Sequence, residues 1–101
     1  MLIGGVWFDG CRESTVTPLE AKARYKRFVG VDGDWLPWFK RSEKKGEPAM
    51  ISQMISQSQA AGAIGRRIEW HVMQPEAESA FRKTLKRSGV KNIDVVLDPM
   101  P

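Results

Sequence analysis

Residues 19–26 read Leu-Glu-Ala-Lys-Ala-Arg-Tyr-Lys, a stretch in which apolar and charged side chains alternate. A period of two is typical of a β-strand that turns one face toward the core. The pattern therefore predicts a strand with one strongly polar face, and it predicts that Ala21 points toward the interior. The residues on the predicted polar face are Glu20, Lys22, Arg24 and Lys26.

Another strand is predicted just ahead of this one. Residues 2–9, Leu-Ile-Gly-Gly-Val-Trp-Phe-Asp, are mostly apolar, although the Gly4-Gly5 pair weakens the strand pattern. Residues 10–17 are predicted to form a loop. Two strands joined by a short loop predict an antiparallel hairpin, which lets Asp9 face the start of the second strand.

The remainder of the chain alternates helix and strand signals. Pro48 suits the first turn of a helix, and residues 49–64 follow it with an apolar stripe at helical spacing. Strands are predicted over residues 68–72 and 93–97, and a second helix is predicted between Pro75 and Gly89. This order of elements predicts an α/β fold. The stripe expected to face the core consists of Met50, Ile51, Met54, Ile55, Ser58 and Ala61.

Residues 29–47 separate the two parts and are predicted to form an irregular excursion with one short helical turn over residues 35–41. Trp35 and Trp38 lie there beside Lys40 and Arg41, and aromatic residues interleaved with basic ones suit contact with nucleic acid. Large aromatic residues usually serve the core, so Trp7 and Trp70 are expected there. A basic cluster near the end of the second helix is expected to be a solvated face: Arg82, Lys83, Lys86 and Arg87.

Composition narrows the chemistry. The 101 residues, 11.4 kDa, allow one domain with one core. Cys11 is the only cysteine and His71 the only histidine, which excludes an internal disulfide, a thiolate zinc cluster and most histidine-based metal sites. No secretory signal and no apolar run long enough for a membrane span are present. The net charge of +4 favours a polyanionic partner.

Glu20-Ala21-Lys22 is the motif that can carry catalysis. On one strand face its two ionisable side chains lie about 6.6 Å apart along the backbone. The carboxylates of Glu20 and Asp9 are expected to form a hard-oxygen site suited to Mg²⁺ or Mn²⁺, and the Ala21 carbonyl is a further candidate ligand. Lys22 can orient the attacking water or stabilise the transition state. The alternative is a surface strand whose Glu20 and Lys22 are merely solvated.

A resemblance supports the catalytic interpretation. Phe8-Asp9-Gly10, Leu19-Glu20-Ala21-Lys22, Gln53-x-x-x-Gln57-x-Gln59 and Ile68-Glu69-Trp70-His71 resemble, in order along the chain, the fifth restriction-endonuclease-fold toxin domain of bacterial polymorphic toxins. TseT-like type VI secretion DNase effectors carry such a domain. The resemblance implies a PD-(D/E)xK core, a mixed sheet flanked by helices. It implies that Asp9 and Glu20 bind metal and that Lys22 assists catalysis.

The resemblance also implies a biological setting. DNA is the expected substrate, the expected destination is the cytoplasm of a target bacterial cell reached through a type VI apparatus, and a cognate immunity protein, acidic by charge complementarity, is the expected partner. In place of the proline that usually precedes the first acid stands Phe8. The helix that usually precedes the first strand is missing. Residues 1–101 are therefore expected to be a single nuclease toxin domain from the C-terminal part of a longer polypeptide.

Further residues are candidates for substrate contact. Gln57 is expected to hold water or phosphate, and Gln53 lies one helical turn before it, whereas Gln59 lies about 200° round the helix from Gln57. His71 alternates with Trp70, so the two rings face opposite sides of their strand. The candidates for nucleic-acid contact are Arg24, Lys26, Arg27, Lys40, Arg41, Gln53 and His71.

Two other functions stay open at this stage. One is a non-catalytic module that binds nucleic acid and whose acidic residues are structural. The other is a house-keeping repair or recombination nuclease of the same fold, which would have neither toxicity nor an immunity partner.

Overall fold

The fold is built on a four-stranded mixed sheet. The computed structural model describes residues 1–12 and 17–99. The strand order is β3-β4-β5-β6, in which β3 is antiparallel to β4 and the other two pairings are parallel. The predicted α/β fold with a mixed sheet is confirmed. The bounds of these strands are β3 Gly10–Arg12, β4 Thr17–Lys22, β5 Ile68–Val72 and β6 Ile93–Leu97.

The N-terminal segment differs from the prediction. In place of one strand over residues 2–9 there is a small hairpin of β1 (Leu2–Ile3) and β2 (Val6–Trp7). Gly4 and Gly5 form its turn with φ values of 54° and 80°, and two successive positive φ angles are what a tight hairpin turn requires. The partner of β4 is therefore β3, which lies where a loop over residues 10–17 was predicted. Residues 13–16 lie outside the described residues.

The helices follow their local signals closely. The predicted turn, the long helix and the second helix are confirmed as α1 (Pro37–Arg41), α2 (Glu47–Gly62) and α3 (Glu78–Ser88). Gly89 ends α3 with a φ of 74°. Two short 3₁₀ turns, η1 (Lys26–Phe28) and η2 (Pro75–Ala77), complete the elements. The strand predicted over residues 19–26 stops at Lys22, and Arg24 takes a positive φ of 63°.

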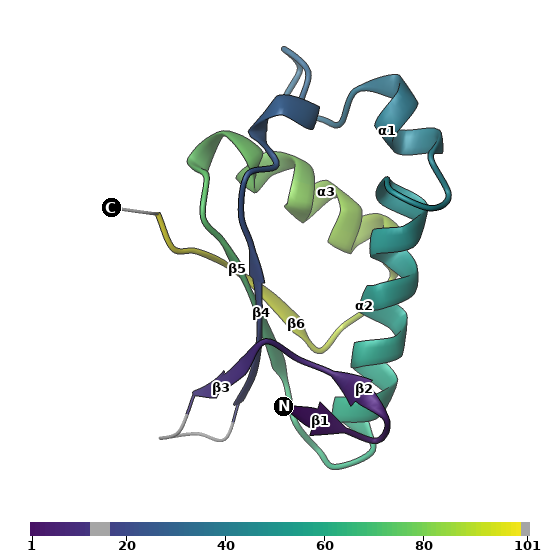
Figure 1. The fold of residues 1–101 in the computed structure, drawn as a ribbon, viewed down its shortest axis with the longest axis vertical. Coiled ribbons are helices and arrows are strands. Elements are labelled where there is room, and N and C mark those ends of the chain that lie inside the picture. The colour runs from purple at the N-terminus through teal and green to yellow at the C-terminus, as the bar shows by residue number, and fades with distance from the viewer. Residues whose placement is uncertain (13–16, 100–101) are drawn as a thin grey trace.

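The described helices lie against one face of the sheet, where α2 runs alongside the strands and α3 crosses above them (Figure 1). Ile68, Trp70 and Val72 of β5 are fully buried on that inner face. From α2 the core receives Met50, Met54 and Ala61, as predicted. Ile55 was wrongly assigned to the core, since 40% of it is exposed, whereas Gln57 is completely buried.

The excursion between β4 and α2 packs as a second part of the core. Trp35 is 2% exposed and its indole Nε1 donates a hydrogen bond of 2.6 Å to Thr84 Oγ1, so the prediction that it stacks on bases was wrong. The residues predicted to form a solvated face of α3 are exposed, and Arg87 among them also donates to the carboxylates of Asp34 and Glu47. Within the described ranges, no helix is both long and apolar enough to cross a bilayer.

Candidate active site

The charged face of β4 is the inner face of the sheet. Glu20 pairs in register with Trp70, which is buried against the helices, whereas Ala21 pairs with His71 and is exposed. The prediction that Ala21 points inward was therefore wrong. The physical reason is that α2 provides polar partners above this strand, so Glu20 can be only 6% exposed without leaving its carboxylate unsatisfied.

The Glu20 carboxylate is held by three donors. Its Oε1 accepts from Gln57 Nε2 at 3.0 Å, and its Oε2 accepts from Gln53 Nε2 at 3.0 Å. Lys22 Nζ lies 3.0 Å from the same Oε2. As a carboxylate offers about four lone-pair positions, Oε2 is saturated and Oε1 retains one free position. Glu20 thus keeps a single direction in which it can accept a further ligand.

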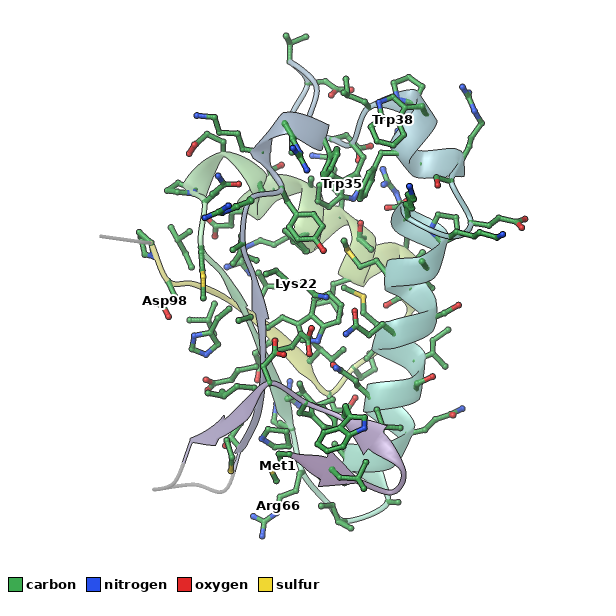
Figure 2. The ribbon with its side chains drawn as sticks, viewed as in Figure 1. Met1, Lys22, Trp35, Trp38, Arg66 and Asp98 are labelled. Atoms are coloured by element: carbon green, nitrogen blue, oxygen red, sulfur yellow. The ribbon has the colours of Figure 1, made fainter. Side chains whose placement is uncertain are left out.

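Lys22 lies between β4 and α2, as Figure 2 shows. Its Nζ donates to Gln53 Oε1 at 2.7 Å and lies 4.8 Å from the centroid of the Trp70 ring. The side chain is 11% exposed. An ammonium group has three donors, and two are taken by Gln53 and Glu20. One N–H remains for a substrate oxygen or a water.

Gln57 links the Glu20 carboxylate to the core. Trp70 Nε1 donates to Gln57 Oε1 at 2.8 Å, which turns the amide so that its Nε2 faces Glu20. The same Nε2 lies 3.4 Å from the Trp7 carbonyl oxygen, at the end of β2. The structure thus brings Gln53 and Gln57 together, one turn apart, around Glu20. The sequence offered no signal for the role of Trp70 as a hydrogen-bond donor in this site.

Asp9 lies beside β4 at the point where the two strands separate. The pairing of β3 with β4 ends at Gly10 and Leu19, and Asp9 Oδ2 accepts a hydrogen bond of 2.8 Å from the backbone N–H of Ala21. Lys22 O accepts from Met73 N and so faces β5. Because backbone groups of successive strand residues point to alternate sides, the Ala21 carbonyl faces the edge where Asp9 lies.

These oxygens fit a hard divalent cation. Asp9 Oδ1 has no hydrogen-bond partner among the residues that the structure describes, Glu20 Oε1 has one free position, and the Ala21 carbonyl faces the same open edge. No group of three His, Cys, Asp or Glu side chains forms a metal cage within the described ranges. Mg²⁺ commonly needs only one or two carboxylates because it retains waters and binds substrate phosphate oxygens. The donor set is therefore of the kind that Mg²⁺ or Mn²⁺ uses.

His71 lies on the outer face of the sheet, as its alternation with Trp70 predicted. Its Nε2 is 2.9 Å from Glu69 Oε1 and its Nδ1 is 3.1 Å from Asp98 Oδ2. Burial lowers the pKa of His71, but hydrogen bonds to the Glu69 and Asp98 carboxylates outweigh it and raise that pKa above its ordinary value. Both ring nitrogens face acids, which does not favour the phosphate contact that the sequence suggested.

A hollow of about 240 Å³ connects His71 and Asp98 with Asp9 and Ala21 on this outer side. Glu20 also lines the hollow. The carboxylate of Glu20, however, lies on the inner face beside Lys22, Gln53 and Gln57, whereas Asp9 and Ala21 line the outer hollow.

The predicted nucleic-acid contacts separate into different places. Arg24, Lys26 and Arg27 line one hollow of about 260 Å³ together with Gln74, whose Oε1 accepts from the backbone of Lys26. Lys40 instead pairs with Asp34 at 2.8 Å, which partly neutralises it. Arg41 is exposed on α1.

Two exposed tryptophans stand out. Trp7 is 71% exposed, which contradicts the expectation that it belongs to the core, and it lies two residues before Asp9. Trp38 on α1 is 49% exposed. Alternation in the short strand β2, where Val6 is partly buried, is the one sequence signal that could have placed Trp7 outside.

The comparison with protein families agrees with this geometry. The model of the family described as restriction endonuclease fold toxin 5 matches residues 1–75, a range that contains Asp9, Glu20, Lys22 and both glutamines. No relative is found among curated proteins. Since the match spans well over half of the chain and the sheet and helices agree with such a fold, the chain belongs to the restriction endonuclease fold toxin 5 family.

Proposed function

We propose that this chain is a metal-dependent endonuclease that hydrolyses phosphodiester bonds of DNA, with Asp9, Glu20 and Lys22 at its reactive centre. The observation that carries the proposal is the Glu20–Lys22 pair. It is held between two glutamine amides on the inner face of the sheet. Asp9 lies nearby, where β3 and β4 separate. Membership in a restriction-endonuclease-fold toxin family supports the same chemistry.

In this proposal Asp9, Glu20 and the Ala21 carbonyl hold Mg²⁺ or Mn²⁺. When bound, such an ion lowers the pKa of a coordinated water and offsets negative charge that develops on the scissile phosphate. The protein's part is to keep the Glu20 carboxylate correctly oriented, which its three donors do. Burying that carboxylate without them would be costly.

Lys22 supplies a positive charge to the reacting phosphate. Its one unused N–H can donate to a non-bridging phosphate oxygen or to the attacking water, both of which need a donor in the transition state. Because Gln53 and Glu20 fix the other two N–H groups, the ammonium needs little reorganisation when the substrate arrives. Gln57 acts through Glu20 and is a positioning residue.

Basic residues around the centre would position the DNA. Arg24, Lys26 and Arg27 follow directly on the reactive strand and share one hollow, so they suit contacts with backbone phosphates. Such contacts carry affinity and salt sensitivity without sequence preference. Trp7, exposed near Asp9, offers a surface on which a base can stack.

The proposed biological role is that of an antibacterial effector. The chain would enter a rival cell through a type VI apparatus and degrade its DNA, and an immunity protein would protect the producing cell. An acidic immunity protein would complement the +4 charge of this chain. Expression of the chain should arrest growth, and co-expression of the immunity protein should restore it.

The decisive experiment is cleavage of plasmid DNA by the purified chain. We expect nicking with Mg²⁺ and none with EDTA. Glu20→Gln and Lys22→Met should each abolish cleavage, and Gln59→Leu on the exposed face of α2 should not. Circular dichroism must show that all three variants fold. DNA binding that is indifferent to divalent ions, with no cleavage, would identify a non-catalytic binding module instead.

A further inference from the structure

We propose that a second pocket, on the helix side of Lys22, binds a DNA phosphate other than the one that is cleaved. The proposal rests on the nuclease function proposed above. The pocket has a volume of about 180 Å³ and lies between β4, the segment before α2, and the first turns of α2. The residues that matter to the argument are Lys22, Tyr25, Lys44, Lys45, Gly46 and Gln53.

The first argument is charge. Three lysines line this small hollow, and no acidic side chain does. Lys44 and Lys45 are exposed and make no side-chain hydrogen bond or ion pair within the described part of the chain. Lys40, in contrast, is paired with Asp34. Lys22 is paired with Glu20, so two of the three ammonium groups, those of Lys44 and Lys45, lack a counter-ion. Phosphate is an anion that lysine commonly binds as a point charge.

The second argument is the fixed position of the segment that carries these lysines. Gly46 packs so closely on α1 that an added Cβ would lie 1.8 Å from the Phe39 carbonyl oxygen. Its N–H donates to Ser42 O at 2.9 Å, and its own carbonyl accepts from Met50 N. The backbone is therefore held in place before any ligand binds, which reduces the entropy lost on binding. The α2 dipole adds positive charge here but would not make a site by itself.

The third argument is the relation to the reactive centre. Lys22 and Gln53 line the lysine pocket, whereas Asp9, Glu20 and Ala21 line the hollow on the other side. The two hollows share no lining residue: Glu20 lines one, and its ion-pair partner Lys22 lines the other. A phosphate beside Asp9 and a phosphate beside Lys44 would therefore be different phosphates of the bound DNA. Tyr25 also lines the pocket, and a phenol can donate to phosphate.

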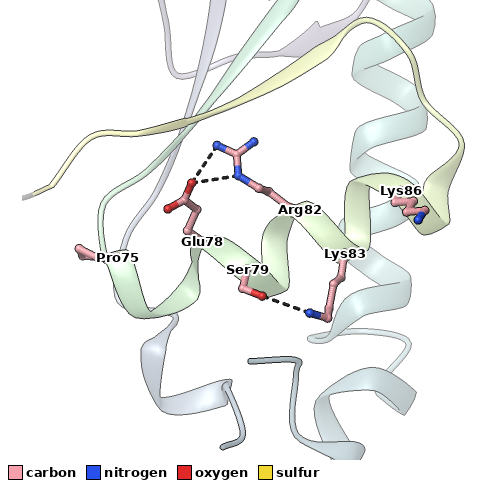
Figure 3. A pocket seen from close by; sticks show the side chains of 6 residues that line it. All are labelled: Pro75, Glu78, Ser79, Arg82, Lys83 and Lys86. Atoms are coloured by element: carbon pink, nitrogen blue, oxygen red, sulfur yellow. Dashed lines mark hydrogen bonds and ion pairs between the residues drawn. The ribbon is translucent and has the colours of Figure 1, made fainter. Parts of the chain in front are cut away.

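A larger basic groove on α3 lacks these properties. Its volume is about 470 Å³, but it contains the carboxylate of Glu78, which pairs with Arg82 at 2.8 Å (Figure 3). Lys83 is likewise directed at Ser79 Oγ, 3.2 Å away. This groove therefore contains an acidic side chain, which the lysine pocket does not.

The test uses the double substitution Lys44→Gln with Lys45→Gln and a matched control, Lys86→Gln with Lys91→Gln. Both remove two exposed cations, and neither control residue lines the pocket. Binding of a fluorescently labelled DNA duplex is measured by anisotropy in EDTA across a series of salt concentrations. We expect the pocket variant to bind about ten-fold more weakly. The slope of log K against log salt should fall by about 1. The control should bind like the unsubstituted chain.

A second arm identifies the phosphate. Duplexes carrying one neutral methylphosphonate at successive positions are cleaved with Mg²⁺, and a duplex with a 5′-phosphate is compared with its 5′-hydroxyl form. A methylphosphonate at one internal position, offset from the scissile bond, should slow cleavage by the unsubstituted chain. The same methylphosphonate should not slow cleavage by the pocket variant any further. If only removal of the 5′-phosphate slows the unsubstituted chain without slowing the pocket variant further, the pocket binds the end of a strand.

The outcomes for the pocket and for the nuclease are separable. Lysine-dependent binding without cleavage would support the pocket and refute the nuclease. Cleavage and binding that are unchanged in the pocket variant, or equally reduced in the control, would refute the pocket alone. Failure of the unsubstituted chain to bind any of the duplexes would also refute it. Melting curves of both double variants confirm that they are folded.

Discussion

Gln57 and Trp70 are joined by a buried hydrogen bond from the indole Nε1 to the amide Oε1, 2.8 Å long, and both side chains are completely buried. This bond determines which end of the amide faces Glu20, because the oxygen end is used by Trp70 and the NH₂ end is left to donate to the carboxylate. A core tryptophan therefore orients a helix glutamine, and the glutamine orients the carboxylate at the proposed reactive centre.

The first prediction concerns this connection. Gln57→Leu should reduce the free energy of unfolding by about 1–3 kcal/mol, since it leaves the Trp70 N–H and one oxygen of Glu20 without their buried partner. Urea denaturation provides the measurement. Gln59→Leu, on the exposed side of the same helix, should change stability little. Equal stability of the two variants would show that the Gln57 contacts contribute nothing.

The second prediction concerns the ion-pair network that attaches the excursion to α3. Arg87 donates to Asp34 and to Glu47, both of which are buried, so Arg87→Ala should remove a cationic partner from each of these two carboxylates. As the Arg87 side chain is 38% exposed, solvent moderates the loss, and we expect roughly 1–3 kcal/mol. Lys86→Ala is the neighbouring control. A loss no greater than in that control would contradict the structural role of Arg87.

The third prediction is that the stability of the chain falls at acidic pH, in part because Asp34 becomes protonated. Hydrogen bonding to Arg87 outweighs burial and holds the pKa of Asp34 well below its usual range in the folded chain. A lowered folded pKa contributes stability that is present above the unfolded pKa and is lost as pH falls below about 4. In the Asp34→Asn variant the melting temperature should fall less steeply as the pH is lowered. Thermal melts at successive pH values measure this dependence, and an unchanged slope in the variant would argue against the role given to Asp34.

The fourth prediction concerns His71. Because its pKa is raised above the ordinary value of about 6.5, the protonated ring contributes stability that is present below that value. This contribution is lost as pH rises through the raised folded pKa. As the only histidine, His71 gives a single ring signal, so its titration by NMR is unambiguous. An observed pKa below 6.5 would contradict the contacts with Glu69 and Asp98.

The fifth prediction links metal binding to stability. If Asp9 and Glu20 hold Mg²⁺, the ion should raise the melting temperature in a concentration-dependent way, since a ligand that binds only the folded state stabilises it. Asp9→Asn should abolish the increase and leave the metal-free melting temperature nearly unchanged, as Asp9 is exposed. An equal Mg²⁺ response in the Asp9→Asn variant would place the ion elsewhere.

Much of the fold follows from local sequence signals. The alternation of Ile68, Trp70 and Val72 correctly predicted β5 and its inner face. Pro48 and Gly89 marked helix termini because a missing N–H and a left-handed backbone are tolerated only at particular helix positions. The pairing of Gln53 with Gln57 was equally predictable, since it depends only on helix geometry.

Other features depend on partners that are distant in sequence. The sheet pairs β4 with β5, some fifty residues later, and this registers Glu20 with Trp70 beneath α2. The charged side of β4 therefore became the buried side, contrary to the simple reading of an amphipathic strand. Trp35 was misjudged for a similar reason, because its partner Thr84 comes from α3.

The sequence by itself determined where the elements begin and end, that Cys and His chemistry is nearly absent, and which acids and lysine can meet on neighbouring strands. Only the tertiary structure decided which face of β4 is covered, which amides fix Glu20, and which cations remain unpaired. The physical reason is that backbone and helix preferences act over a few residues, whereas burial and electrostatic pairing depend on groups that the fold brings together from far apart.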